Sequence, residues 1–187
     1  MPKIDIFEPK KENERRTIVL IVTNQCNLKC KYCYEQHRVK KNDTMDFDTA
    51  KKIITKYMNK DDEFDLIEIQ FFGGEPLLAF PLIKKIVDWF HTKTWKKKHV
   101  FFIPTNGTIL TDEMKKWLEC NRNDVKLGFS LDGNKTAHNL GRDNSYDRVM
   151  KNLPFFKENW PEQILKMTIY EETIPYIADS VIELEEK

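Results

Sequence analysis

The sequence predicts an α/β fold in which about five β–α units form a partial (β/α) barrel, open at its carboxyl-terminal edge. Apolar runs alternate with helical patterns along the chain, which indicates parallel strands joined by crossover helices. Three of the expected strands also alternate polar with apolar residues, whereas parallel strands covered on both faces are usually apolar throughout. Their polar faces would therefore line a shared interior that is wet or filled by a ligand.

The order of elements follows from these runs. Strands are expected at 17–22, 66–72, 100–103, 125–131 and 164–170. A helical pattern follows each strand, and Asp46, Thr111 and Thr173 have the side chains of helix N-caps. Pro154 is expected to disturb the helix that begins near Tyr146, because proline removes a backbone donor.

The alternating strands distinguish a barrel from an ordinary doubly wound sheet. The positions expected to face the interior are Glu68, Gln70, Phe72, Lys126, Gly128, Ser130, Lys166, Thr168 and Tyr170. The positions expected to face the helices are Ile67, Ile69, Phe71, Val125, Leu127, Phe129, Leu165, Met167 and Ile169. A solvated edge strand explains one such pattern but hardly three.

Bulk composition limits the broad class. The chain has 187 residues, 40% of them hydrophobic and 33% charged, which is typical of one globular domain. A net charge of +1 favours neither nucleic acid nor a membrane surface as partner. The segment Met1–Arg16 is polar, and no apolar stretch is long enough to span a bilayer. We therefore expect a cytoplasmic protein with reduced thiols.

Three of the four cysteines follow the first expected strand in the spacing C-x₃-C-x₂-C: Cys26, Cys30 and Cys33. Three thiolates on one loop can bind three irons of a [4Fe–4S] cluster. The fourth iron then has no protein ligand nearby, and a missing ligand is where substrate chemistry can take place. A ligand with an amine and a carboxylate could chelate that iron.

Two other kinds of metal site remain open from the spacing alone. Structural zinc would need a fourth ligand, for which His37 is the nearby candidate. A simple electron carrier would need a fourth cysteine, but Cys120 lies after a helix, at the opposite end of a β/α barrel from loops that follow strands. We therefore expect Cys120 to be a buried structural thiol.

The cysteine loop, with Tyr32 as its aromatic residue, and Gly73-Gly74-Glu75-Pro76 after the second strand resemble motifs of the radical S-adenosylmethionine (radical SAM) superfamily. Thr105-Asn106-Gly107 and Ser130-Leu131-Asp132-Gly133, with His138 and Arg142 beyond, resemble its SPASM/twitch subgroup, which matures peptides and sulfatases. The resemblance runs from about Thr17 to the end and implies a TIM-like partial barrel with one catalytic domain over 1–187.

The resemblance implies one [4Fe–4S] cluster on Cys26, Cys30 and Cys33, and S-adenosylmethionine as second cofactor. It further implies an oxidoreductase that cleaves S-adenosylmethionine reductively to a 5′-deoxyadenosyl radical, which takes hydrogen from a peptide or protein. The residues that it implies for S-adenosylmethionine are Tyr32, Gly73, Gly74, Glu75, Asn106, Ser130, Asp132 and Arg142.

Individual roles follow from the same resemblance. Glu75 would receive the amino group of S-adenosylmethionine. Arg142 either pairs with the methionyl carboxylate or is a solvated loop residue, and Asn106 is either a ligand contact or a turn residue. Tyr32 either flanks the adenine or shields the cluster. His138 is expected to be a packing or loop residue.

The sequence departs from the subgroup in extent. The subgroup's barrel has six β–α units and carries auxiliary clusters after it, whereas this chain supplies five units and no cysteines after them for auxiliary clusters. The chain is then a fragment, is completed by self-association or a partner at the open edge beside 164–170, or binds a cluster without turnover. A small-molecule enzyme or an activase is the other enzymatic hypothesis. Reduced flavodoxin or ferredoxin is the expected electron donor.

Overall fold

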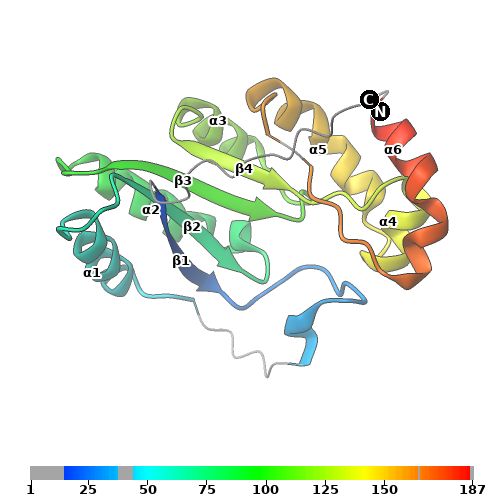
Figure 1. The fold of residues 1–187 in the computed structure, drawn as a ribbon, viewed down its shortest axis with the longest axis horizontal. Coiled ribbons are helices and arrows are strands. Elements are labelled where there is room, and N and C mark those ends of the chain that lie inside the picture. Colours follow the sequence, from blue (N-terminus) through cyan, green and yellow to red (C-terminus); the bar gives the residue numbers. More distant parts are fainter. Residues whose placement is uncertain (1–14, 38–43, 164, 186–187) are drawn as a thin grey trace, which may run out of the picture.

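A computed structural model of the chain describes residues 15–37, 44–163 and 165–185. Most of the polar amino-terminal segment and Ile164, the first residue of the fifth expected strand, lie outside these ranges. The sheet has four parallel strands in the order β1-β2-β3-β4 (Figure 1). They are β1 (Arg15–Thr23), β2 (Leu66–Gly73), β3 (Lys98–Thr105) and β4 (Val125–Phe129). This confirms the predicted α/β class.

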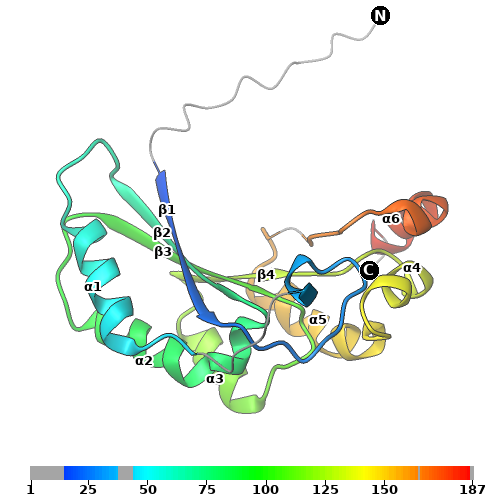
Figure 2. The same ribbon diagram turned by 90° about the horizontal axis from the view of Figure 1, so that it is seen from below.

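Helices follow the strands in sequence. The α-helices are α1 (Phe47–Met58), α2 (Phe80–His91), α3 (Asp112–Cys120), α4 (Lys135–Gly141), α5 (Tyr146–Asn159) and α6 (Ile177–Glu185). The 3-10 helices are η2 (Tyr34–His37), η3 (Pro76–Ala79) and η4 (Glu171–Tyr176). Figure 2 shows α1, α2 and α3 along one side of the curved sheet. Among the described residues, no helix is long and apolar enough to cross a membrane.

Two predicted N-caps are present. The Asp46 carboxylate accepts a hydrogen bond of 2.8 Å from the backbone N–H of Thr49, and the Thr111 hydroxyl accepts one of 3.2 Å from that of Met114. Each side chain satisfies a donor that has no partner within the first turn, so the starts of α1 and α3 are fixed locally. Local sequence was therefore enough to place both helix starts.

The hydrophobic core lies between the helices and one face of the sheet. Residues paired across all four strands meet there, with Ile18 opposite Ile69, Ile69 opposite Phe101, and Phe101 opposite Val125. These side chains are at most 7% exposed. The apolar positions predicted on β2 and β4 are all fully buried in this core. On the opposite face of the curved sheet (Figure 2), the predicted interior positions Gln70, Phe72 and Gly128 line a cavity, which confirms the partial barrel.

The prediction of a fifth strand at 164–170 is wrong, because residues 165–170 form no strand. Lys166 alone forms a bridge, parallel to Ser130, with its backbone N–H donating to the Phe129 carbonyl at 2.8 Å. The predicted alternation fails there too, because Ile169 is 52% exposed and Met167 lines the same cavity as Lys166. A single bridge does not hold the neighbouring residues in a strand. Their side chains therefore need not alternate between the two faces of the sheet.

Two expectations about helices also need correction. Pro154 lies inside α5, which continues to Asn159, because the residues on its inner face, including Leu153 and Phe156, are buried in the core. The last α-helix begins at Ile177 rather than Thr173, which sits in η4. Tertiary packing outweighs the helix-breaking tendency of proline in the first case.

Candidate functional site

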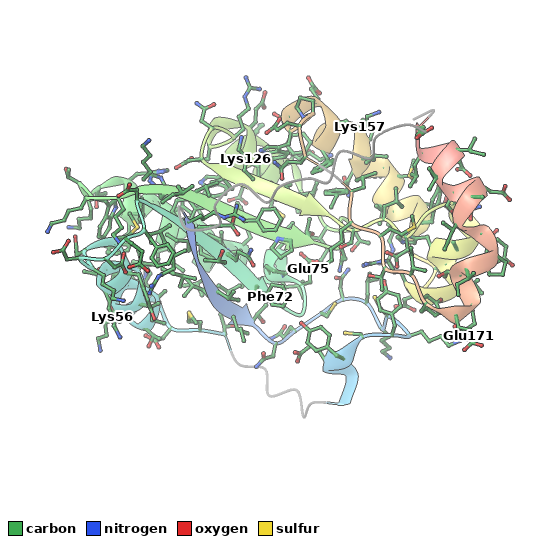
Figure 3. All side chains as sticks on the ribbon, in the orientation of Figure 1. Lys56, Phe72, Glu75, Lys126, Lys157 and Glu171 are labelled. Carbon is green, nitrogen blue, oxygen red and sulfur yellow. The ribbon has the colours of Figure 1, made fainter. Side chains whose placement is uncertain are left out.

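A cavity of about 820 Å³ lies at the carboxyl ends of the strands. Its wall combines the cysteine loop, the turn after β2, and residues beyond β3 and β4. The predicted site residues that line it are Cys26, Cys30, Tyr32, Cys33, Gly73, Gly74, Glu75, Asn106, Ser130 and Arg142. Figure 3 labels Phe72 and Glu75 near the tips of β2 and β3, on this side of the molecule. Every predicted site residue except Asp132 therefore lines the cavity.

Backbone hydrogen bonds hold the cysteine loop to the turn after β2. The N–H of Gly74 donates to the Thr23 carbonyl at 3.1 Å, and that of Glu75 donates to the Gln25 carbonyl at 2.7 Å. We call this contact between 23–25 and 73–75 the backbone seam. On its other side the loop donates from the Lys31 N–H to a carbonyl of α4, at 2.8 Å.

The two glycines of the motif are required by the backbone seam. A Cβ on Gly73 would lie 1.9 Å from the Thr23 oxygen, and one on Gly74 would lie 2.3 Å from the Gln25 oxygen. Gly73 also has φ of +152°, in a range that side-chain-bearing residues rarely adopt. The resemblance implies that these glycines contact S-adenosylmethionine. They line the cavity, but the close approach visible here is to the chain itself.

The three thiols of the loop fit an iron–sulfur cluster. None of the three is in a disulfide, all are partly buried, and Cys26 and Cys33 both act electrostatically on Cys30. Burial, together with these neighbours, raises the pKa of Cys30 to about 11, against the opposing effect of Arg142. Three thiolates in this space need added positive charge, which cluster iron supplies, and sulfur is the donor that such clusters require.

A fourth thiol or imidazole ligand is absent from the described cavity wall. Among the described side chains, no other cysteine or histidine lines it. The thiol of Cys120 is exposed at the end of α3, so the expectation that it is buried is wrong. In α3 the buried side chains are Trp117 and Leu118. Cys120 does not fall on the helix face that these two residues form, so its thiol is exposed.

Glu75 is 1% exposed, and both of its carboxylate oxygens are already hydrogen-bonded. Oε1 accepts from the Thr105 hydroxyl at 2.8 Å and from the Leu77 N–H at 3.1 Å, while Oε2 accepts from the Asn106 N–H at 2.8 Å. Burial raises the pKa of Glu75 in spite of these donors. The carboxylate thus joins the ends of β2 and β3, a role that the motif alone did not reveal.

Asp132 lies behind the cavity wall and organises two residues that form it. Its Oδ2 accepts from the Nε of Arg142 at 2.7 Å and from the Tyr32 hydroxyl, and its Oδ1 accepts from the Thr168 N–H at 2.9 Å. Arg142 is 7% exposed, so it is not the solvated loop residue considered above. Burial alone would lower the pKa of Arg142, but the charge and hydrogen bond of Asp132 outweigh it.

The His138 imidazole contacts the backbone of Asp132. It is fully buried, its Nδ1 accepts from the Asp132 N–H at 3.2 Å, and Nε2 meets the Ser145 hydroxyl at 2.9 Å. Burial, with the charge of Arg142, lowers the pKa of His138 to about 4. The imidazole is therefore neutral at pH 7, with the tautomer assigned from the Nδ1 acceptor role. This agrees with the expected packing role.

Sequence reasoning missed one connection inside the site. The Asn106 side-chain amide donates to Asn27 Oδ1 at 2.9 Å, and the Asn27 amide donates to the Thr108 hydroxyl at 2.8 Å. These bonds tie the cysteine loop to the turn after β3. The available signals were Asn27 inside the cysteine loop and Asn106 beside Gly107. Asparagine is also a common turn residue, so neither signal was specific.

A family model described as "Radical SAM superfamily" matches residues 20–181. An uncharacterised protein of Methanocaldococcus jannaschii, MJ0907, is 42% identical over 116 residues, covering 62% of this chain and 38% of that protein. The cysteine-type anaerobic sulfatase-maturating enzyme of Clostridium perfringens strain 13 is 27% identical over 145 residues, covering 71% and 38%. This chain thus spans about two fifths of the length of these curated relatives.

A solved structure shares the fold. The structure described as native anSMEcpe with bound AdoMet and Kp18Cys peptide superposes with a TM-score of 0.78 at 24% identity, covering 92% of this chain and 48% of that one. The family model covers most of the sequence, including every predicted site residue. The chain therefore belongs to the radical SAM superfamily, whose cofactors are a [4Fe–4S] cluster and S-adenosylmethionine.

Proposed function

We propose that this chain forms the catalytic part of a radical SAM enzyme that acts on a peptide or protein. The observation that carries the proposal is the single cavity at the carboxyl end of the sheet, onto which both the three cysteines and Gly73-Gly74-Glu75 open. In parallel α/β folds this end of the sheet is where ligands bind. The four strands share one hydrophobic core, which supports one catalytic domain.

In this proposal Cys26, Cys30 and Cys33 hold the cluster, and one iron keeps a position for the amine and carboxylate of S-adenosylmethionine. Bound there, the two cofactors supply electron transfer, cleavage of a carbon–sulfur bond and a 5′-deoxyadenosyl radical that takes hydrogen from the substrate. The chain itself positions the thiols through the backbone seam.

Residues around the cysteines are proposed to orient S-adenosylmethionine. Glu75 Oε2 accepts a hydrogen bond from the Asn106 N–H, and because a carboxylate oxygen has two lone pairs it can also accept from an ammonium group. Arg142 uses Nε for Asp132, which leaves its terminal nitrogens for a carboxylate. Tyr32, Gly73, Gly74, Asn106 and Ser130 would complete the contacts. Asp132 acts by positioning Arg142 and Tyr32.

The substrate class is supported by the relatives and by the cavity wall. One curated relative is named as a sulfatase-maturating enzyme, and the solved structure named above holds a peptide. Here Gln70, Phe72, Phe102 and Lys166 line the concave face of the sheet. This mixture of amide, aromatic and cationic groups suits a peptide side chain flanked by its backbone. Reduced flavodoxin or ferredoxin is proposed as the electron donor.

The test is anaerobic reconstitution with iron and sulfide, reduction with dithionite, and addition of S-adenosylmethionine. We expect about four iron and four sulfide per chain, and formation of 5′-deoxyadenosine and methionine. Full cluster loading without 5′-deoxyadenosine would favour a cluster-binding relative without turnover. Zinc in place of iron in protein purified without oxygen would refute the cluster itself.

Replacement of Cys120 by alanine is expected to leave iron content and 5′-deoxyadenosine formation equal to those of the wild type. The thiol is exposed on α3 and does not line the cavity, and surface substitutions of this kind change stability by about 0.5 kcal/mol or less. Iron and sulfide analysis beside the activity assay provides the measurement. A large loss of iron in Cys120→Ala would show that this thiol supports the cluster after all.

A further inference from the structure

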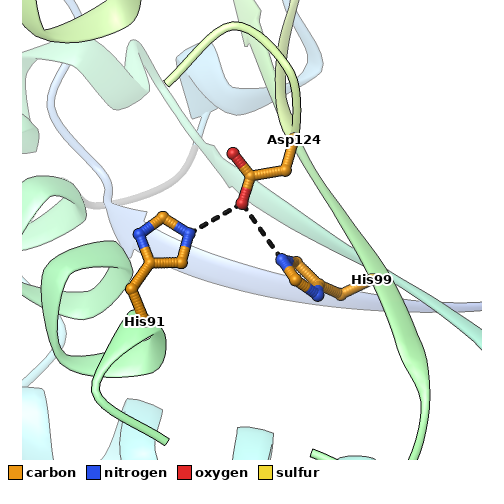
Figure 4. Close-up of side chains that lie close together, drawn as sticks. All are labelled: His91, His99 and Asp124. Atoms are coloured by element: carbon orange, nitrogen blue, oxygen red, sulfur yellow. Dashed lines mark hydrogen bonds and ion pairs between the residues drawn. The ribbon is translucent and has the colours of Figure 1, made fainter. Parts of the chain in front are cut away.

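Two histidines and an aspartate converge at the amino end of the sheet, outside the cavity described above. His91 ends α2, His99 is the second residue of β3, and Asp124 directly precedes β4. Figure 4 shows both imidazoles pointing at one carboxylate oxygen. The Nε2 of His91 lies 2.7 Å from Asp124 Oδ2, and the Nε2 of His99 lies 3.0 Å from the same atom.

We propose that His91, His99 and Asp124 form a binding site for a divalent transition metal of the zinc type. Imidazole nitrogen and carboxylate oxygen are ordinary zinc ligands, and bonds of about 2.0–2.2 Å place neighbouring ligand atoms of a tetrahedron about 3.3 Å apart. The three ligand atoms here lie within 4.8 Å of one another. The two nitrogen–oxygen distances of 2.7 Å and 3.0 Å lengthen by roughly 0.3–0.6 Å to reach this spacing, and water takes the fourth position.

The protein holds these ligands in place before any metal arrives. The His99 ring packs against Phe90 at 4.4 Å and Phe101 at 5.4 Å between centroids. The Asp124 carbonyl accepts a 2.7 Å hydrogen bond from the Phe101 N–H, so the backbone beside the carboxylate is fixed. Fixed ligands lose little conformational entropy on binding.

Charge and access also suit a cation. Burial raises the pKa of Asp124, but the hydrogen bonds from His99 and His91 outweigh that effect and lower it, so the carboxylate is ionised at pH 7. The side chains of His91, His99 and Asp124 are 38%, 26% and 24% exposed, so an ion can enter from solvent. To bind metal, each imidazole gives up the Nε2 proton that it donates to Asp124 and carries its remaining proton on Nδ1.

The site is remote from the thiols. His99 and Thr105 stand at opposite ends of β3, and the strand rises about 3.3 Å per residue, which separates them by roughly 20 Å. A metal at His99 would therefore brace α2, β3 and the connection before β4 without touching the cavity. The proposal does not depend on the enzymatic activity.

The experiment uses the full chain with its thiols already occupied by iron and sulfide. The protein is equilibrated anaerobically with Zn²⁺ and dialysed, and zinc per chain is measured by mass spectrometry for wild type, His99→Gln and Asp124→Asn. Asp88→Asn is the matched control, since it alters an exposed acid on α2 next to His91. X-ray absorption at the zinc edge then identifies the ligand atoms of the wild-type protein.

We expect the wild type and Asp88→Asn to retain one zinc per chain, and His99→Gln and Asp124→Asn to bind it at least about tenfold more weakly. The absorption spectrum should show only nitrogen and oxygen near 2.0–2.2 Å, whereas zinc on cysteine would show sulfur near 2.3 Å. No retained zinc, a sulfur shell, or equal retention in His99→Gln would each overturn the proposal. The absorption spectrum of the wild-type protein tests the proposed nitrogen and oxygen ligands even if a variant folds poorly.

Discussion

Replacing Cys30 by alanine is expected to abolish cluster binding and to reduce 5′-deoxyadenosine to the level found without protein. Cys30 lines the same cavity as both other thiols and Arg142. Without it, two thiolates remain for four irons, and a cluster with two bare irons is lost or converted to a smaller one. Iron and sulfide content, the visible absorption of the cluster and product analysis all measure the effect.

The matched control for this change is Cys120→Ala, which removes a thiol of the same size from an exposed position. Cys30→Ser adds a graded comparison, because a hydroxyl is a poorer ligand for cluster iron than a thiolate. We expect iron content to fall in the order wild type, Cys30→Ser, Cys30→Ala. Normal iron content and product in Cys30→Ala would contradict the proposed ligand set.

Asp132→Ala is expected to produce the largest loss of stability, about 3–5 kcal/mol in the free energy of unfolding. Its carboxylate is fully buried, and removing it leaves the guanidinium of Arg142, 9% exposed, without its anion. The Tyr32 hydroxyl and the Thr168 N–H lose their acceptor as well. Urea unfolding measures the change, and Tm should fall by roughly 10 °C for a chain of this size.

An aspartate on the surface provides the control. Asp48 in α1 pairs with Lys51 at 2.7 Å but is 73% exposed, so Asp48→Ala should cost less than about 1 kcal/mol. Asp132→Asn keeps acceptor oxygen but loses the charge, and its cost should be intermediate. Equal destabilisation by Asp132→Ala and Asp48→Ala would mean that the buried ion pair contributes little to folding.

Local signals explain why much of the fold could be predicted from the sequence. The caps at Asp46 and Thr111 act within one helical turn, and the alternation along β2 and β4 reflects burial of one face. These features depend on neighbouring residues, so a pattern of a few positions contains them. The same holds for the cysteine loop, whose spacing lies within eight residues.

Features set by distant contacts could not be predicted in this way. An alternating pattern suggested a strand at 164–170, yet only Lys166 pairs with its neighbour. Pro154 suggested a break, yet burial of Leu153 and Phe156 keeps α5 continuous. Whether a sequence pattern forms the expected strand or helix depends on the segments that pack against it, and those segments are far away in sequence.

The candidate site shows the same division. Motif spacing placed the cysteines and Glu75 at strand ends, and the structure gathers them around one cavity. Nothing in the motifs showed that Glu75 would bind the backbone N–H of Asn106, or that Asp132 would be used by Arg142. The His91, His99 and Asp124 group was missed entirely, because three residues that meet only through folding show no common spacing.

The backbone seam has a consequence for how this sequence can diverge. Main-chain atoms make its hydrogen bonds, so the identities of Asn24 and Gln25 matter little to the geometry of the loop that follows. Gly73 and Gly74, on the other side of the backbone seam, cannot be replaced in this way, because a Cβ at either position would collide with a carbonyl oxygen. Divergence of this sequence is therefore expected to be one-sided: Asn24 and Gln25 can be replaced, whereas Gly73 and Gly74 leave no room for a side chain.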